Sequence, residues 1–222
     1  MKKYWWKVLT CTLLFYTVAM AFTGDVPALD ILHETIRNLY FHVPMWFGMI
    51  VLLTVSLVYS TKYLGSNKIR EDRVAVEAAN VGVLYGILGL ITGSLWAKNT
   101  WGAWWVNDAK LNGAAVTMLA YLAYFILRNS FPESQRKAQI SAVYNIFAYV
   151  LMLVFILILP RLTDSLHPGN GGNPGFNTYD LDNRMRLVFY PAVAGWILLG
   201  VWLLELRVRI ARLRDEDKET RA

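Results

Sequence analysis

The chain has 222 residues, of which 56% are hydrophobic and 17% are charged, against about 25% charged in soluble globular domains. This composition excludes a disordered chain and argues against an ordinary soluble domain, and the single cysteine, Cys11, excludes an internal disulfide or a thiolate metal cluster. The formal net charge of +6 arises from short basic blocks between apolar runs, a pattern that indicates membrane topology rather than a nucleic-acid surface.

Six apolar stretches, each almost free of charge in its middle, predict six transmembrane helices. A bilayer core about 30 Å thick requires roughly 20 helical residues, because every backbone amide must find its partner within the segment. The predicted helices cover about residues 4–22, 39–61, 78–97, 111–129, 141–160 and 186–206. We therefore expect an all-α integral membrane protein, with one six-helix domain over residues 1–222 and a basic tail over residues 207–222.

The basic residues predict the orientation of these helices. Sixteen of the 22 Lys and Arg residues fall at the amino end, in the 2/3 and 4/5 loops and in the tail. Because cytoplasmic loops carry the excess of basic residues, both termini are expected in the cytoplasm and the other three loops outside. Residues 19–21, Ala-Met-Ala, resemble a signal cleavage site, but the apolar run before them is long for a secretory signal, which favours an uncleaved anchor.

The middles of the helices hold few polar groups. One face of the third predicted helix carries four glycines spaced by three or four residues, Gly82, Gly86, Gly89 and Gly93. This spacing predicts that another helix packs closely there. Helices three to five have no ionisable residue at mid-depth, and polar residues such as Thr92 and Asn145 stand isolated along the sequence. A proton-relay or ion-coupled transporter is therefore disfavoured.

The most unusual composition lies between the third and fourth predicted helices, in residues 96–112. Four of the nine tryptophans occur there within ten residues, Trp96, Trp101, Trp104 and Trp105. An interfacial aromatic belt is one interpretation, because indoles favour the headgroup level. The Trp-Trp pair followed by Asp108 and Lys110 also fits a flat apolar platform for a planar ligand that carries acidic groups. Composition alone leaves both interpretations open.

All three histidines are expected on the outer side. His42 opens the second helix in NLYFHVPMWFG, and His167 lies in the glycine-rich loop between the fifth and sixth helices. His33 lies in an amphipathic stretch, residues 27–40, that fits a segment on the membrane surface. Two imidazoles from different loops can bind one haem iron from opposite faces. A solvated or structural histidine is the alternative at each position.

Three segments resemble haem-handling proteins of cytochrome c maturation. The string WGAWWVNDAKL resembles their tryptophan-rich WWD signature, and FHVPMWFG and SLHPG are similar to the contexts of their two haem-ligating histidines. With six helices in a short chain, the sequence is identified as similar to CcmC, the haem exporter protein C family, over essentially its whole length. It departs from the pattern at Asn107, where the signature has a third tryptophan, and at Asn112, where it has a small hydroxyl residue.

The resemblance implies a role in haem transfer rather than catalysis. His42 and His167 would be axial ligands of a non-covalently bound b-type haem at the periplasmic face of the bacterial inner membrane. The residues implied as its platform are Trp101, Gly102, Trp104, Trp105 and Asp108. The basic residues that are candidates for pairing with the haem propionates are Lys98, Lys110, Arg161 and Arg184. Asp108 is independently expected as the N-cap of the fourth helix, because an aspartate there accepts amide hydrogens from the first turn.

The resemblance also implies partners. These are a CcmE-type haem chaperone that receives the haem, an ABC-type complex with CcmA and CcmB, and the small membrane peptide CcmD. The chain has no P-loop, so any use of nucleotide belongs to a partner. Two other functions remain as alternatives. The related haem lyases CcsA and CcmF are longer and carry further histidines within the membrane, whereas a small-solute permease requires a polar path through the helices.

Overall fold

The structure is a computed structural model that describes residues 4–27, 29–167 and 181–221, and within these ranges it contains helices and connecting turns but no strand. The α-helices are α1 (Trp5–Thr23), α2 (Leu39–Ser66), α3 (Ile69–Trp101), α4 (Ala109–Asn129), α5 (Ser134–Met152), α6 (Leu159–Leu162) and α7 (Asn183–Arg221). A 3-10 helix, η1 (His33–Asn38), precedes α2, and a π-helix, η2 (Leu153–Ile158), joins α5 to α6. Six of the resulting segments are long and apolar enough to cross a membrane, which confirms the predicted all-α, six-helix class.

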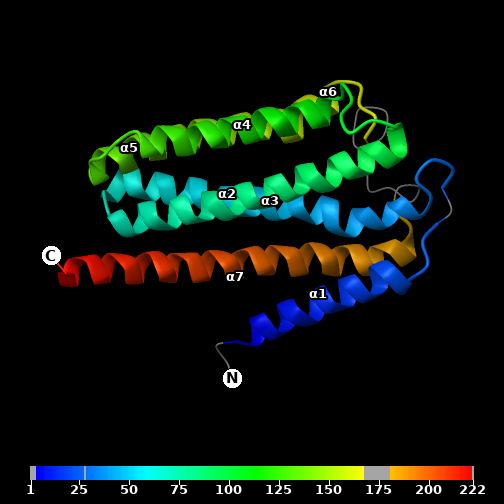
Figure 1. The fold of residues 1–222 in the computed structure, drawn as a ribbon, viewed down its shortest axis with the longest axis horizontal. Helices are drawn as coiled ribbons and strands as arrows, with labels where there is room; N and C mark the ends of the chain where they lie inside the picture. Colours follow the sequence, from blue (N-terminus) through cyan, green and yellow to red (C-terminus); the bar gives the residue numbers. More distant parts are fainter. Residues whose placement is uncertain (1–3, 28, 168–180, 222) are drawn as a thin grey trace.

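The long helices lie side by side and alternate in direction (Figure 1). The pair α2 and α3 lies at the centre, α4 and α5 pack on one side of it, α7 packs on the other, and α1 lies against α7. One end of the bundle holds the start of α2, the end of α3 and the segment after α6. We call it the histidine end, because His42 and His167 both lie there. At the opposite end α1 begins and α7 ends.

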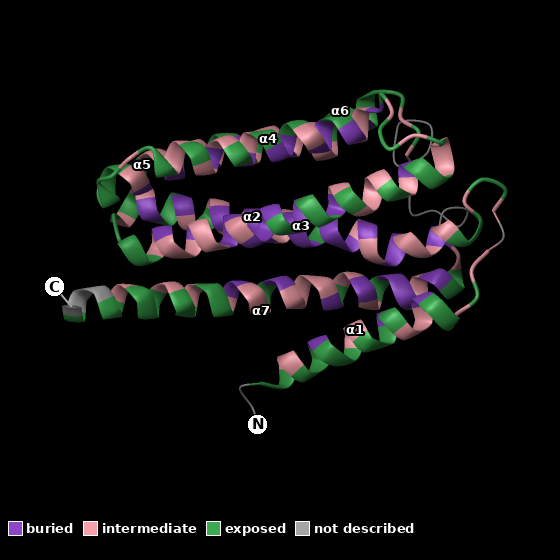
Figure 2. Cartoon of the chain, in the orientation of Figure 1, coloured by how far each residue is buried: buried purple, intermediate pink, exposed green. Residues whose placement is uncertain are grey.

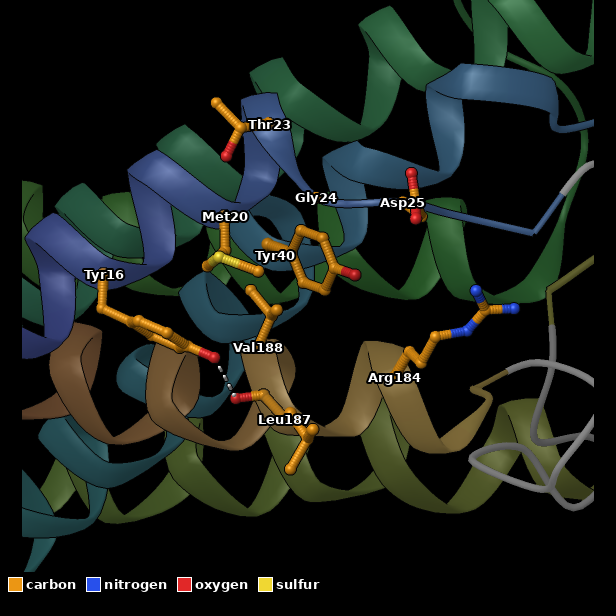
Figure 3. A pocket seen from close by; sticks show the side chains of 9 residues that line it. All are labelled: Tyr16, Met20, Thr23, Gly24, Asp25, Tyr40, Arg184, Leu187 and Val188. Atoms are coloured by element: carbon orange, nitrogen blue, oxygen red, sulfur yellow. Dashed lines mark hydrogen bonds between the residues drawn. The ribbon is translucent and has the colours of Figure 1, made fainter.

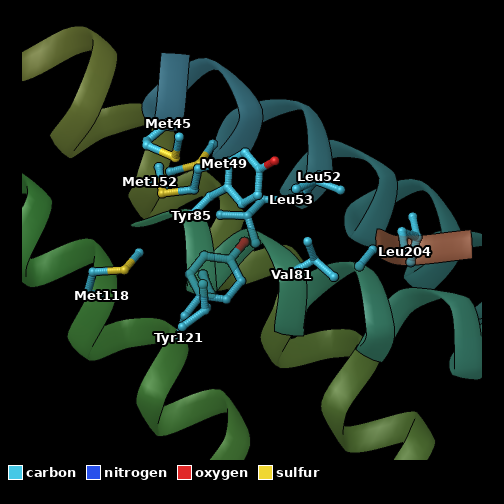
Figure 4. Close-up of a cluster of buried hydrophobic side chains, with 13 residues drawn as sticks. Met45, Met49, Leu52, Leu53, Val81, Tyr85, Met118, Tyr121, Met152 and Leu204 are labelled. Carbon is cyan, nitrogen blue, oxygen red and sulfur yellow. The ribbon is translucent and has the colours of Figure 1, made fainter. Parts of the chain in front are cut away.

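The core lies between the central helices. Buried residues concentrate on α2, α3 and the inward faces of their neighbours, whereas the outward faces of α1, α4 and α5 are largely exposed (Figure 2). The largest buried side chains of the central cluster come from five helices and are drawn in Figure 4: Met45, Met49, Leu52, Leu53, Val81, Tyr85, Met118, Tyr121, Met152 and Leu204. Exposed apolar side chains on the outward faces are what a surface in hydrocarbon requires.

The glycine face of α3 packs against α2, as predicted. A Cβ atom built on Gly82 would lie 2.7 Å from Leu53 Cδ2, and one on Gly89 would lie 2.9 Å from Trp46 Cε2. At the histidine end, a Cβ on Gly93 would lie 2.6 Å from His42 Cε1. The glycines therefore set how closely α2 approaches α3, and the last of them leaves the space that the His42 ring fills.

Several helices extend beyond their predicted ends. The structure begins α3 at Ile69 instead of residue 78, and α7 continues through the predicted tail to Arg221. Charged side chains in these extensions pair with neighbouring helices: Asp72 accepts from both terminal guanidinium nitrogens of Arg128 at 2.8 and 2.6 Å, and Arg207 Nε lies 2.5 Å from Glu77 Oε2. Hydropathy marks only the part of a helix that lies in hydrocarbon. The charged segments beyond it are therefore not predicted as helix from the sequence, although they continue α3 and α7.

Within the stretch expected on the membrane surface, the 3-10 helix His33–Asn38 runs directly into α2 and buries Ile36. Polar residues that stand isolated along the sequence are joined in the structure. Asn145 Nδ2 donates to Ser56 Oγ at 2.7 Å and to Ser60 Oγ at 2.8 Å, so it joins α5 to α2. Side-chain hydrogen bonds of this kind hold membrane helices together, because the alternative is an unsatisfied polar group in hydrocarbon.

Candidate functional site

Asp108 begins α4 and caps it, as predicted. Its backbone is extended, with φ −129° and ψ 141°, and its Oδ1 accepts hydrogen bonds from the backbone amides of Lys110 at 2.9 Å and Leu111 at 3.3 Å. The first amides of a helix have no partner within the helix, so a carboxylate at this position satisfies them and also complements the positive end of the helix dipole.

The same carboxylate also holds the segment that follows α6. Asp108 Oδ2 accepts from Ser165 Oγ and from the Leu166 amide, both at 2.8 Å, and Oδ1 contacts His167 Nδ1 at 2.9 Å. The Asp108 side chain is only 1% exposed. Burial opposes its ionisation, but the hydrogen bonds from His167, Leu166 and Ser165 outweigh that effect and hold the pKa of Asp108 well below its ordinary value. A single ionised carboxylate thus connects two segments far apart in the sequence.

This contact fixes the state of the His167 imidazole. A carboxylate oxygen can only accept a hydrogen bond, so Nδ1 carries the proton and Nε2 carries the lone pair when the ring is neutral. The ring packs edge-on against Trp101, with centroids 4.9 Å apart and planes at 77°. His167, Trp101 and Asp108 therefore form one cluster at the histidine end, which brings together three residues that the sequence analysis singled out.

Gly102 has a structural role beside this cluster. It follows the last residue of α3 with φ +79°, a left-handed conformation that glycine adopts without steric cost. Its carbonyl oxygen accepts a hydrogen bond from Lys98 Nζ at 2.9 Å. Gly102 thus ends α3 directly after Trp101 and directs the chain into residues 103–107.

His42 lies in the first turn of α2 and is buried against α3. Its Nδ1 is 3.1 Å from the Gly89 carbonyl oxygen and 3.1 Å from Thr92 Oγ1. Because the carbonyl can only accept, Nδ1 is again the protonated nitrogen. Its Nε2 accepts a hydrogen bond from the indole Nε1–H of Trp46 at 3.3 Å, one turn further along α2. Both histidines therefore hold Nδ1–H on an oxygen and keep the lone pair on Nε2.

Both imidazoles lie against the end of α3. His42 contacts Trp96 edge-on at a centroid distance of 5.8 Å, and His167 contacts Trp101, five residues later on the same helix. Five helical residues span about 7.5 Å along the axis and turn by about 140°, so the two rings contact different sides of α3. Residues 42 and 167, separated by most of the chain, thus meet at the same end of one helix.

The Trp-Trp pair lies beside this cluster, with Trp104 58% and Trp105 43% exposed. Trp105 Nε1 donates to Asn112 Oδ1 at 3.2 Å, and Asn112 Nδ2 donates to Asn107 Oδ1 at 2.7 Å. Asn107 and Asn112, the two departures from the WWD signature, are therefore hydrogen-bonded to each other. Asn112 also orients the indole of Trp105, which matches the signature.

The four predicted propionate partners occupy different surroundings. Lys98 is bonded to the end of its own helix, Lys110 lies in the first turn of α4, and Arg161 is exposed on α6. Arg184 lines a cavity of about 310 Å³ between α1, α2 and α7 (Figure 3). This cavity also contains Asp25, so Arg184 belongs to a neighbouring part of the histidine end.

Sequence reasoning missed three contributors. Trp46 could have been found, because it lies four residues after His42 on one helix and such residues share a face. Thr92 depends on the register between α2 and α3, which periodicity does not give. Ser165 donates to Asp108 and also accepts from the His167 amide at 3.1 Å, a contact across 57 residues that has no local signal.

Comparison with known proteins matches the sequence to one family. The family model for CcmC, described as heme exporter protein C, matches residues 1–222. The chain is 25% identical to the heme exporter protein C of Haemophilus influenzae over 197 residues, covering 83% of this chain and 74% of that protein. It is 27% identical to that of Escherichia coli K12 over 190 residues, covering 81% and 69%. It is 30% identical to that of Bradyrhizobium diazoefficiens over 182 residues, covering 81% and 68%. The chain therefore belongs to the heme exporter protein C family of multi-pass membrane proteins, with a role in haem export and cytochrome c maturation.

Proposed function

We propose that the chain holds haem as cargo at the histidine end, with the iron between Nε2 of His42 and Nε2 of His167. The observation that carries this proposal is the shared state of the two rings. Each Nδ1–H is held by an oxygen, from Gly89 on one side and Asp108 on the other, so each lone pair lies on Nε2. Histidines that ligate metals in proteins are oriented in this way, with the second ring nitrogen donating to a carbonyl or a carboxylate.

The surroundings suit a flat, largely apolar macrocycle. Trp96 and Trp101 pack against the two imidazoles, and Trp104 and Trp105 expose indole surface beside them. Aromatic rings supply contact area to a planar ligand, and Lys110 or Lys98 is placed near the same segment to meet the propionates. In this assignment Asp108 is a positioning residue, because it acts on the haem through His167.

The role is binding and transfer rather than catalysis. A haem carrier needs ligands that hold iron without changing the macrocycle and that release it to the next protein. Segments at the opposite end carry most of the basic residues, which is typical of the cytoplasmic side. We therefore place the histidine end on the periplasmic side of the bacterial inner membrane. The proposed recipient is a CcmE-type chaperone, and the proposed assembly contains CcmA, CcmB and a CcmD-type peptide.

Purified protein tests the proposal through its haem content. The chain is expressed in cells that make haem but lack the recipient chaperone, and haem is measured by absorbance per mole of protein. We expect His42→Ala and His167→Ala each to lose most of the haem that the wild type retains. His33→Ala is the matched control, because His33 is exposed at the same end. Equal haem in all four proteins, or a wild type without haem, would contradict the proposal.

A further inference from the structure

The lone pair proposed to bind iron already has a partner within the chain. His42 Nε2 accepts a hydrogen bond from Trp46 Nε1 at 3.3 Å, and the two rings meet edge-on with centroids 6.1 Å apart. His42 is buried, so without Trp46 this nitrogen would be an unsatisfied acceptor in a site of low polarity. An iron atom at Nε2 requires the same lone pair, so the indole and the iron cannot both use it.

Of the two rings, the Trp46 indole is held by fewer hydrogen bonds. The His42 imidazole is held by two hydrogen bonds through Nδ1, and it fills the space left by Gly93. Trp46 is half-buried and lies against Gly89, but in the described part of the chain its indole nitrogen makes one hydrogen bond, the one to His42. A rotation of the indole away from His42 therefore frees Nε2 at the cost of one hydrogen bond and leaves the imidazole in place.

We propose that Trp46 is a protecting group on His42, which occupies Nε2 when haem is absent and competes with the iron for it. The consequence is a lower affinity than two fixed imidazoles would give. Each time haem leaves, the indole N–H replaces the lost iron bond, so departure does not leave a buried acceptor unpaired. This arrangement favours handing haem on over keeping it. The inference rests on the proposed haem-carrying function and adds a residue that controls release.

The chain offers a matched control on the other side of the same imidazole. Trp96 contacts His42 edge-on at 5.8 Å, but its indole N–H donates to Thr35 Oγ1 at 3.1 Å instead. Trp46→Phe and Trp96→Phe therefore make the same chemical change next to the same ring, and only the first removes a hydrogen bond from Nε2.

The first experiment measures how haem partitions at equilibrium between each protein and apomyoglobin, followed by absorbance in detergent. One hydrogen bond is worth a factor of about three to ten in an equilibrium. We expect Trp46→Phe to bind haem about three- to tenfold more tightly than the wild type, and Trp96→Phe to bind it no more tightly. Equal or weaker binding by Trp46→Phe would overturn the proposal, because a mere platform residue loses contact area on this change.

The second experiment needs no haem. In haem-free protein labelled with ¹⁵N-histidine, the His42 Nε2 resonance, assigned by its loss in His42→Ala, should move much further in Trp46→Phe than in Trp96→Phe, because only the first loses a hydrogen bond to Nε2. Benzothienylalanine at position 46 repeats the test with the indole shape kept and only the N–H removed. An unmoved resonance overturns the protecting-group proposal. If the wild type binds no haem but its His42 Nε2 resonance still moves on Trp46→Phe, the proposed function is overturned while the hydrogen bond between Trp46 and His42 is supported. The two failures are therefore distinguishable.

Discussion

The two ends of the bundle satisfy their polar groups in different ways. At the opposite end, charged side chains pair across helices: Arg128 with Asp72, Arg207 with Glu77, and Lys7 with Glu205 at 2.8 Å. At the histidine end, a carboxylate and a carbonyl each hold one imidazole, and indoles surround both rings. The first arrangement neutralises charge within the protein. The second directs two nitrogen lone pairs and leaves aromatic surface exposed, which is what a binding site requires.

The largest effect is expected when an ion pair at the opposite end is removed. Arg128→Gln leaves the Asp72 carboxylate, which is 7% exposed, without its bidentate partner. Removing one member of a buried pair costs about 3 kcal/mol or more, so the unfolding midpoint in detergent should fall while haem per folded protein stays unchanged. Arg212→Gln is the control, because its pair with Glu216 is exposed and contributes little. Haem loss with unchanged stability would mean that the two ends are not separate in function.

The next test breaks the histidine end at Asp108. Asp108→Ala removes the hydrogen bonds that Ser165, Leu166 and His167 make to the start of α4, and loss of a group that orients a metal ligand typically costs 10- to 100-fold in affinity. Haem titration of the purified protein should show a loss of that size. Asp164→Ala, an exposed neighbour in the same segment, should bind haem as the wild type does. Similar affinities for both variants would remove the positioning role from Asp108.

Asp108 also predicts a dependence on pH. Its pKa is lowered in the folded protein, so its contribution to stability is complete above the unfolded value of about 3.9 and is lost as pH falls further toward the folded value. Between about pH 5 and pH 8 the Asp108 carboxylate stays ionised. Unfolding midpoints measured from pH 7 to pH 3 should fall less steeply in Asp108→Asn than in the wild type.

A smaller effect is expected from the packing around His42. Gly93→Ala places a methyl group 2.6 Å from His42 Cε1, and the ring cannot retreat without loss of its bond to Gly89. Displacement of a ligand should weaken haem binding about tenfold, measured by titration. Gly65→Ala is the matched control, since a Cβ there meets nothing within 4 Å. If Gly93→Ala binds haem normally, His42 is not held as rigidly as the structure indicates.

The smallest effect is expected at Asn112. Asn112→Ala removes the acceptor for the Trp105 indole and the donor to Asn107, both on the exposed surface. Only the bond from Trp105 involves a proposed platform residue, and loss of one exposed hydrogen bond is worth about 1 kcal/mol or less, so haem affinity should fall no more than about fivefold. Asn112→Gln keeps both functional groups and should recover part of the loss. A large loss would show that Trp105 orientation matters more than exposure implies.

The sequence predicted the fold class, the Asp108 cap and the glycine face of α3, because their signals are local. Six apolar runs gave the helices, the position of Asp108 before an apolar run gave the cap, and spacing gave the glycine face. What it missed depends on tertiary register. The pairing of Asp72 with Arg128 and the contact of Thr92 with His42 arise only once helices lie side by side. Asn107 and Asn112 were both recognised as departures, but their bond to each other needed the turn before α4.

The most direct measurement of the central claim is the electron paramagnetic resonance spectrum of the ferric haem complex, with and without added imidazole. Two histidine ligands from this chain predict a low-spin signal in the wild type, a high-spin signal in His42→Ala and in His167→Ala, and recovery of the low-spin signal when free imidazole replaces the missing ring. A low-spin signal that survives in either variant without added imidazole would contradict the account, because the iron would then have another ligand.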